Sequence, residues 1–166
     1  GPPFMVRGHK AEQEIVSAWE AKYKVPIFTS GMSQAQALRA LGIKKFVGCT
    51  YFRDQKMNDV FTRYFTDCGF EVLAMEGMDT SPSEADGISN ETIYQHLKAS
   101  FNKHPTAQGI YLLGSGAWGI KDIVTAENDL GVPVVHPVAA RVWYVQKLLK
   151  IKNPLKGASR LLEELP

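Results

Sequence analysis

Two stretches of this chain repeat each other at a distance of about 108 residues. The first copy covers residues 8–41 and the second covers residues 116–149. The clearest matches are segments 14–18 with 122–126, 25–28 with 132–135, and 41–44 with 149–152. A repeat of this length is typical of a duplicated lobe and not of a solenoid, whose units are shorter. We therefore expect two similar α/β halves that face each other, with any ligand held between them.

The repeat also predicts how the chain is divided. A full set of predicted elements, starting near Lys44, precedes the second copy, whereas only seven residues precede the first. We expect residues 1–32 to be the remnant of a first α/β lobe truncated at the N-terminus, and residues 33–137 to form a complete second lobe. Residues 138–166 are expected to return as helices toward the first lobe. The segment Gly1-Pro2-Pro3 fits either a processing remnant or a loop after an absent strand.

Composition sets the broad class of protein. A chain of 166 residues, 45% of them hydrophobic, can bury one sizeable core. Its net charge of +2 gives no electrostatic basis for binding nucleic acid or an anionic membrane, and no apolar run approaches the ~18 residues of a membrane span. Cys49 and Cys68 form no CxxC motif and the four histidines are scattered. We therefore expect no metal, no cofactor and a reducing, cytoplasmic location.

Strand and helix patterns alternate along most of the chain. Short apolar runs typical of buried strands occur at residues 45–49, 70–74, 108–113 and 132–136. Helical spacing predicts helices over residues 9–23, 33–41, 54–68, 89–100, 117–130 and 139–149. Residues 25–29 are predicted as a further strand, and the polar segment 75–87 as a loop. This alternation predicts an α/β fold with a parallel four-stranded sheet flanked by helices.

The most specific candidate for a ligand-binding loop is the glycine-rich turn at residues 112–119. It leads from a predicted strand into a predicted helix, and it matches the G-x-G-x-x-G pattern literally. A dinucleotide site would also need an acid at the end of the following strand, but that strand ends in His136-Pro137. An anion-binding turn for a carboxylate or phosphate is therefore preferred, with a nucleotide-binding domain as the weaker alternative.

Further segments carry a resemblance to a known family. They are Ala37–Ile43, Thr50-Tyr51, Gly69–Val72, and Leu130–Val135 after the glycine turn. From about Phe4 to Ile151 the chain resembles the aspartate/glutamate racemase superfamily, in its maleate cis-trans isomerase and arylmalonate decarboxylase branch. The resemblance implies two pseudo-symmetric α/β lobes with an active site in the cleft between them.

The resemblance also implies a set of site residues. Typical members carry a cysteine at a strand tip in each lobe, where the sulfur moves a proton or attacks the substrate. The second-lobe motif Leu-Leu-Ser-Cys-Thr corresponds to residues 112–116, which places Ser115 at the cysteine position as the candidate catalytic residue. The first-lobe position falls at Gly1 or before it. The candidate substrate-binding residues are Thr50, Tyr51, Gly114, Gly116, Ala117 and His136.

Each of these residues has an expected part. Tyr51 would donate its phenolic O–H to a substrate carboxylate, helped by Thr50 and by backbone N–H groups of residues 115–117. His136 is the candidate base for Ser115, since a lone serine hydroxyl is a poor acid and a poor nucleophile. Serine is also an excellent helix N-cap, which is the structural alternative for Ser115.

These expectations define the functional hypotheses. The first is an enzyme that needs no cofactor and acts on a small dicarboxylate, by isomerisation, decarboxylation or racemisation through an enolate or a thiol adduct. The alternative is a homologue that binds a small carboxylate without catalysis, or that has no ligand. The expected partner is a small carboxylate, with neither nucleic acid nor membrane, and association into a homo-oligomer is left open.

Overall fold

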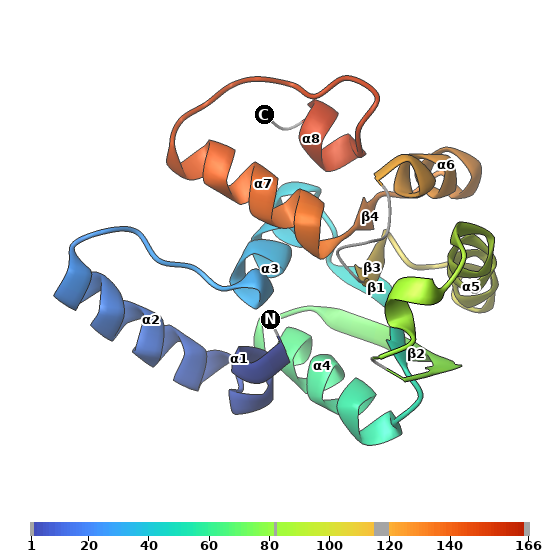
Figure 1. Ribbon diagram of the computed structural model, residues 1–166, viewed down its shortest axis with the longest axis horizontal. Coiled ribbons are helices and arrows are strands. Elements are labelled where there is room, and N and C mark those ends of the chain that lie inside the picture. The colour runs from blue at the N-terminus through green and yellow to red at the C-terminus, as the bar shows by residue number, and fades with distance from the viewer. Residues whose placement is uncertain (1, 82, 115–119, 165–166) are drawn as a thin grey trace.

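The computed structural model of the protein describes residues 2–81, 83–114 and 120–164 (Figure 1). Its centre is a four-stranded parallel sheet with the strand order β2-β1-β3-β4. The strands are β1 (Lys45–Phe52), β2 (Glu71–Thr80), β3 (Ile110–Leu113) and β4 (Val134–Val135). The α/β class and the parallel four-stranded sheet flanked by helices are therefore confirmed.

Helices cover both faces of this sheet (Figure 1). They are α1 (Pro2–Arg7), α2 (His9–Tyr23), α3 (Ser30–Ala40), α4 (Gln55–Asp67), α5 (Asn90–Lys103), α6 (Ile120–Leu130), α7 (Pro137–Leu148) and α8 (Arg160–Glu164), with a short 3-10 turn η1 at Ala85–Gly87. Helices α5 and α6 pack on one face, while α3, α4 and α7 lie on the other.

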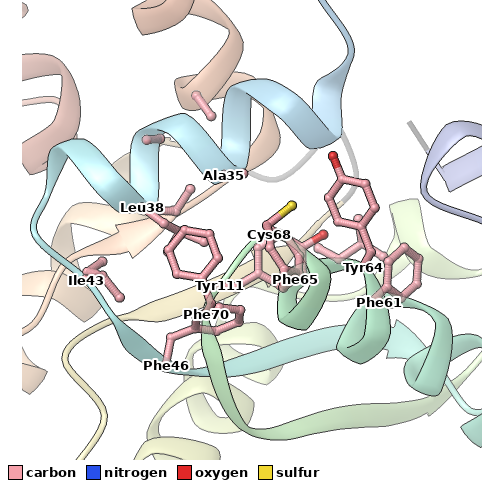
Figure 2. Close-up of a cluster of buried hydrophobic side chains, with 14 of the residues drawn as sticks. Ala35, Leu38, Ile43, Phe46, Phe61, Tyr64, Phe65, Cys68, Phe70 and Tyr111 are labelled. Atoms are coloured by element: carbon pink, nitrogen blue, oxygen red, sulfur yellow. The ribbon is translucent and has the colours of Figure 1, made fainter. Parts of the chain in front are cut away.

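Alternation along β1 divides the core into two clusters. Val47 and Cys49 point into the cluster beneath α5 and α6. Phe46 points to the opposite face, where it meets the ring of Phe65 at 5.3 Å between centroids; Phe65 in turn lies 4.6 Å from Tyr111 (Figure 2). Because these side chains are fully buried, β1 is covered on both faces, as is typical of a parallel sheet.

Local signals explain where the helices begin. Asp54 caps α4 by accepting a hydrogen bond from Lys56 N at 2.9 Å, and Ser89 caps α5 by accepting one from Thr92 N at 3.2 Å. Helix α4 is followed by Gly69, whose φ of +90° is left-handed and suits glycine. The predicted starts of both helices are thus confirmed.

Two predicted segments differ from the structure. Residues 25–29, predicted as a strand, lie outside every strand of the described sheet, because no described strand is placed to pair with them. Residues 75–80, predicted as part of a loop, belong to β2, because hydrogen bonding to β1 continues as far as Thr80 opposite Phe52. Ladder pairing overrides the polar composition of that segment.

The sequence repeat reappears in the backbone. Lys24 and Gly131 occupy equivalent positions after α2 and α6, and both are left-handed, with φ of +57° and +74°. After α3 and α7, Gly42 and Lys150 are left-handed in the same way, with φ of +71° and +56°. Each copy of the repeat, called a unit below, therefore contains two helices, and the residues that follow these helices have the same left-handed backbone in both units.

A duplicated glutamate closes the junction inside each unit. Glu20 accepts a hydrogen bond from Ile27 N at 2.9 Å, and Glu127 accepts one from Val134 N at 2.8 Å, each across seven residues. Glu127 is buried, and it also accepts a hydrogen bond from Arg160 N at 2.9 Å, at the start of α8. Glu20 is exposed, so the same hydrogen bond is in contact with water in the first unit and buried in the second.

The two units also differ in how their second helix is covered. On α3, Ala35 and Leu38 are buried beside the aromatic cluster. On α7, Val142 and Val145 are partly exposed, with exposed fractions of 39% and 40%. With Leu149 they form an apolar stripe on the surface of α7 and its C-cap.

The duplicated glutamate provides a matched stability test. Glu127→Ala leaves two backbone N–H groups without an acceptor, one of them buried, and we expect it to lower the free energy of unfolding by about 2 kcal/mol. Glu20→Ala removes the equivalent exposed bond, which water replaces, and should cost less than about 0.5 kcal/mol. Urea unfolding of both variants measures the difference, and equal losses would contradict it.

The apolar stripe predicts self-association. Exposed apolar patches promote contact between molecules, so sedimentation velocity of the unmodified chain should show a sedimentation coefficient that rises with concentration. The double variant Val145→Glu with Leu149→Glu should sediment as a monomer over the same range. The pair Ala99→Glu with Asn102→Glu, both exposed on α5, adds the same two negative charges and should leave the association unchanged.

Candidate functional site

The candidate site lies at the carboxyl edge of the sheet. Strands β1 and β3 are parallel neighbours, and Thr50 is opposite Leu113, so Tyr51 and Gly114 follow at the same edge. Tyr111 is opposite Val135 on β4, which brings His136 to that edge as well. The predicted meeting of these strand ends is thus present, as the parallel topology requires.

Tyr51 is the clearest hydrogen-bond donor at this edge. Its side chain is half-buried against both core clusters, and its ring lies 4.5 Å from that of Phe52. Burial, together with the negative charge of Asp86, raises the pKa of the Tyr51 phenol above its usual value. The phenol therefore keeps its proton at neutral pH and is able to donate it in a hydrogen bond.

Thr50 is committed within the protein. The residue is fully buried, its hydroxyl donates to Asn58 Oδ1 at 2.7 Å, and the same oxygen accepts a hydrogen bond from Phe52 N at 3.3 Å. Its single proton is thus already in use. The geometry gives Thr50 a part in holding the end of β1, while its predicted contact with a ligand remains a prediction.

His136 links β4 to α7. It is fully buried, and its Nδ1 accepts a hydrogen bond from Val138 N at 3.3 Å as the N-cap of the helix. In the first copy of the repeat, Thr29 caps α3 in the same manner by accepting from Met32 N at 3.1 Å. An imidazole that accepts at Nδ1 is neutral and carries its proton on Nε2.

Of the remaining predicted site residues, one is described by the structure and three are not. Gly114 is described and is partly buried directly after β3. Ser115, Gly116 and Ala117 lie outside the described residues. Their predicted parts as catalytic residue and backbone donors therefore remain predictions from the sequence.

Neither cysteine is placed for chemistry. Cys49 points into the core beneath α5, and Cys68 packs in the aromatic cluster at the end of α4. Burial raises the pKa of each thiol to about 12. At neutral pH both are protonated and inaccessible, which is the ordinary state of a structural cysteine.

The acidic residues between 76 and 86 point to separate partners. Glu76 meets Lys103 at 3.4 Å and His104 at 3.3 Å, whereas Glu84 accepts a hydrogen bond from Ser81 N at 3.0 Å. Within the described ranges, no group of three or more His, Cys, Asp or Glu side chains gathers in a metal-binding arrangement.

Sequence reasoning missed Asn58 and Asp86. Asn58 shares the buried face of α4 with Phe61 and Phe65, and its exposed fraction is only 1%. A polar residue on the apolar side of a predicted amphipathic helix was the available signal. Asp86 influences Tyr51 across a loop, and no pattern in the sequence joins the two.

Comparison with protein families identifies the relationship. A model of the arylmalonate decarboxylase family matches residues 4–162, which is almost the whole chain. The chain belongs to the arylmalonate decarboxylase family. No curated protein sequence matches it significantly.

Solved structures with the same fold agree with this assignment. A liganded double mutant of arylmalonate decarboxylase superposes with a TM-score of 0.90 at 21% identity, over 98% of this chain and 70% of that one. Maleate cis-trans isomerase of Nocardia farcinica, bound to TRIS, gives a TM-score of 0.84 at 18% identity over 98% and 68%. The maleate isomerase Iso of Pseudomonas putida S16 gives 0.85 at 17% identity over 99% and 68%. At such identities the likeness establishes the fold.

The helices give no indication of a membrane span. Among those described, none is both long and apolar enough to cross a bilayer.

The buried thiols yield a direct prediction. At pH 8, well below a pKa of about 12, Cys49 and Cys68 of the folded protein should not react with 5,5′-dithiobis(2-nitrobenzoic acid) within minutes. In guanidinium chloride both thiols should react at once. Rapid release of one thionitrobenzoate per folded chain would show instead that one cysteine is accessible and ionised.

Proposed function

We propose that this protein binds a small dicarboxylate of the malonate or maleate kind at the carboxyl edge of its sheet. The observation that carries the proposal is the half-buried Tyr51, neutral and at the same edge of the sheet as Gly114. A neutral phenol donates a strong hydrogen bond to a carboxylate, and backbone N–H groups of residues 115–117 would supply further donors. Membership of the arylmalonate decarboxylase family supports this class of ligand.

We further propose that the bound dicarboxylate undergoes decarboxylation or isomerisation. In decarboxylation, the bond between the α-carbon and one carboxylate breaks and carbon dioxide leaves. The electron pair of that bond stays on the remaining fragment, which becomes an enolate. Hydrogen-bond donors aimed at the second carboxylate stabilise that charge. A proton must then reach the α-carbon. Ser115 is proposed to deliver it, either from its own hydroxyl, which water then reprotonates, or from a water molecule that it orients, and a hydroxide ion is left in either case.

The isomerase route differs in using sulfur. One related structure, a mutant of the Nocardia farcinica maleate cis-trans isomerase, contains a covalently bound succinylcysteine intermediate. A thiol adduct of that kind needs an accessible thiolate, whereas Cys49 and Cys68 are both buried with raised pKa values. Neither Cys49 nor Cys68 can therefore supply the thiolate of that route.

A second candidate function follows from the same thiols. A homologue without an accessible cysteine, and with serine where the family motif has cysteine, would still bind a carboxylate through Tyr51 and backbone donors. Such a protein would bind phenylmalonate and release no carbon dioxide. Measuring carbon dioxide release on the same samples used for binding separates the enzyme from the binding protein.

The test uses isothermal titration with phenylmalonate and with maleate. Tyr51→Phe removes the donor while keeping the ring, and we expect it to weaken binding about tenfold, as for a hydrogen bond to a charged group. Ser115→Ala should weaken turnover or binding, while unchanged behaviour would assign Ser115 to helix capping alone.

Tyr94→Phe is the matched control. Its hydroxyl is exposed and donates to Asp129 on α6 at 2.8 Å, so its loss should leave the affinity unaltered. Equal affinities for the unmodified protein and Tyr51→Phe would overturn the proposed part of Tyr51.

A further inference from the structure

The end of β1 is held by one side chain of α4. Asn58 accepts a hydrogen bond from the Thr50 hydroxyl at 2.7 Å and donates one from Nδ2 to the carbonyl oxygen of Phe52 at 3.2 Å. Thr50 Oγ1 accepts a third from Phe52 N at 3.3 Å. These bonds engage the residues on both sides of Tyr51, so the backbone there is fixed from α4.

The neighbouring strand is shaped to allow this arrangement. A Cβ atom on Gly77 would lie 2.1 Å from the carbonyl oxygen of Phe52 and 2.7 Å from Asn58 Nδ2. Both distances are too short for a Cβ atom, so only glycine fits at this position. The ladder also changes register here, since Thr50 is opposite Gly77 while Phe52 is opposite Thr80. The extra residue in β2 marks a bulge, a feature that often redirects a side chain beside a functional site.

The ring contacts carry this restraint to Tyr51. The ring of Phe52 stacks on Phe61 at 5.7 Å with an angle of 23° between planes. The centroid of the Tyr51 ring lies 4.5 Å from that of Phe52, with an angle of 36° between the planes. The direction of the phenol therefore depends on Phe52, and both backbone polar groups of Phe52 are bound by the Thr50 and Asn58 pair.

An asparagine at position 58 costs more free energy than a purely structural contact requires. Asn58 is almost fully buried beside Phe61, where an apolar residue would pack without any need for partners. A buried amide costs free energy unless it is hydrogen-bonded, and asparagine also disfavours the helix interior. Here Oδ1 and Nδ2 are each satisfied by the segment that carries Tyr51.

We propose that Asn58 is a positioning residue that sets the direction of the Tyr51 phenol toward the ligand carboxylate. This inference rests on the proposed function, because Tyr51 must contact the ligand for its direction to matter. It assigns to α4, a helix outside the family motif, a part in the affinity of the site. Thr50 and Gly77 complete the device, one as the hydrogen-bonding bridge and the other as the space it needs.

A double-mutant cycle with phenylmalonate tests the coupling. Asn58→Ala should weaken binding about tenfold in the unmodified protein and less than about twofold when Tyr51 is already Phe, because residues that act together are not additive. Equal weakening in both backgrounds would show that Asn58 supports the fold only, and would overturn the proposal. Asn58→Leu removes both hydrogen bonds but fills nearly the same volume, so it provides a second variant should Asn58→Ala unfold.

Thr62→Val is the matched control on the same helix. The Thr62 hydroxyl donates to the carbonyl oxygen of Asn58 at 3.1 Å, within α4, so its removal should leave the affinity unchanged. A loss as large as that of Asn58→Ala would assign the effect to α4 in general and overturn the proposal.

A second readout is independent of binding. Because burial raises the pKa of Tyr51, release of its ring in Asn58→Leu should move that pKa back toward the ordinary tyrosine value without adding a charge. A ¹³C NMR titration of labelled tyrosine, assigned with Tyr51→Phe, measures this change. An unaltered Tyr51 pKa would overturn the positioning role even if phenylmalonate does not bind, whereas absence of binding with a shifted pKa would count against the proposed function alone.

Discussion

Burial of β1 on both faces is the constraint on which the rest of the structure depends. Its side chains alternate between the aromatic cluster of Phe46, Phe65 and Tyr111 and the aliphatic cluster that contains Val47 and Cys49. A strand covered in this way needs partners on both edges, which β2 and β3 provide in parallel. Parallel pairing requires crossover helices, and these bring every strand end to one edge. The position of Tyr51 beside Gly114 is a consequence of that geometry.

Hydrogen bonds and burial within the core limit which side chains can take part in chemistry at this edge. Thr50 and His136 each bind a neighbouring backbone group, and the two thiols are enclosed among apolar side chains. Tyr51 is half-buried and keeps its proton. A site that relies on neutral donors suits an anionic ligand, since donors at a low-dielectric edge stabilise charge without titrating themselves.

The sheet and its helices were predictable because their signals are local. Asp54 and Ser89 mark helix starts, Gly69 follows a helix end, and the apolar runs around Val47 and Leu112 give the buried strands. Pairing was less predictable, because the polar segment 75–80 joins β2 through ladder hydrogen bonds that its composition does not encode.

The candidate site was predictable only in part for a similar reason. Tyr51 and the glycine-rich turn stand at strand ends that the sequence reveals, and the parallel topology brings Tyr51 beside Gly114. Asn58 and Gly77 are distant from each other in the chain, and their meeting at the carbonyl of Phe52 depends on packing in three dimensions. No spacing rule connects residues from a helix and a bulged strand.

The duplicated glutamate bears on how such a molecule arises. Glu20 and Glu127 each tie a helix to the segment that follows it, one in contact with water and one enclosed by α8. A unit that sets the angle of its own exit strand does not depend on its surroundings for that angle. After a gene duplication, each copy could then acquire different neighbours while keeping its internal shape. The hydrogen bond is the same in both copies, although the surfaces around it have diverged.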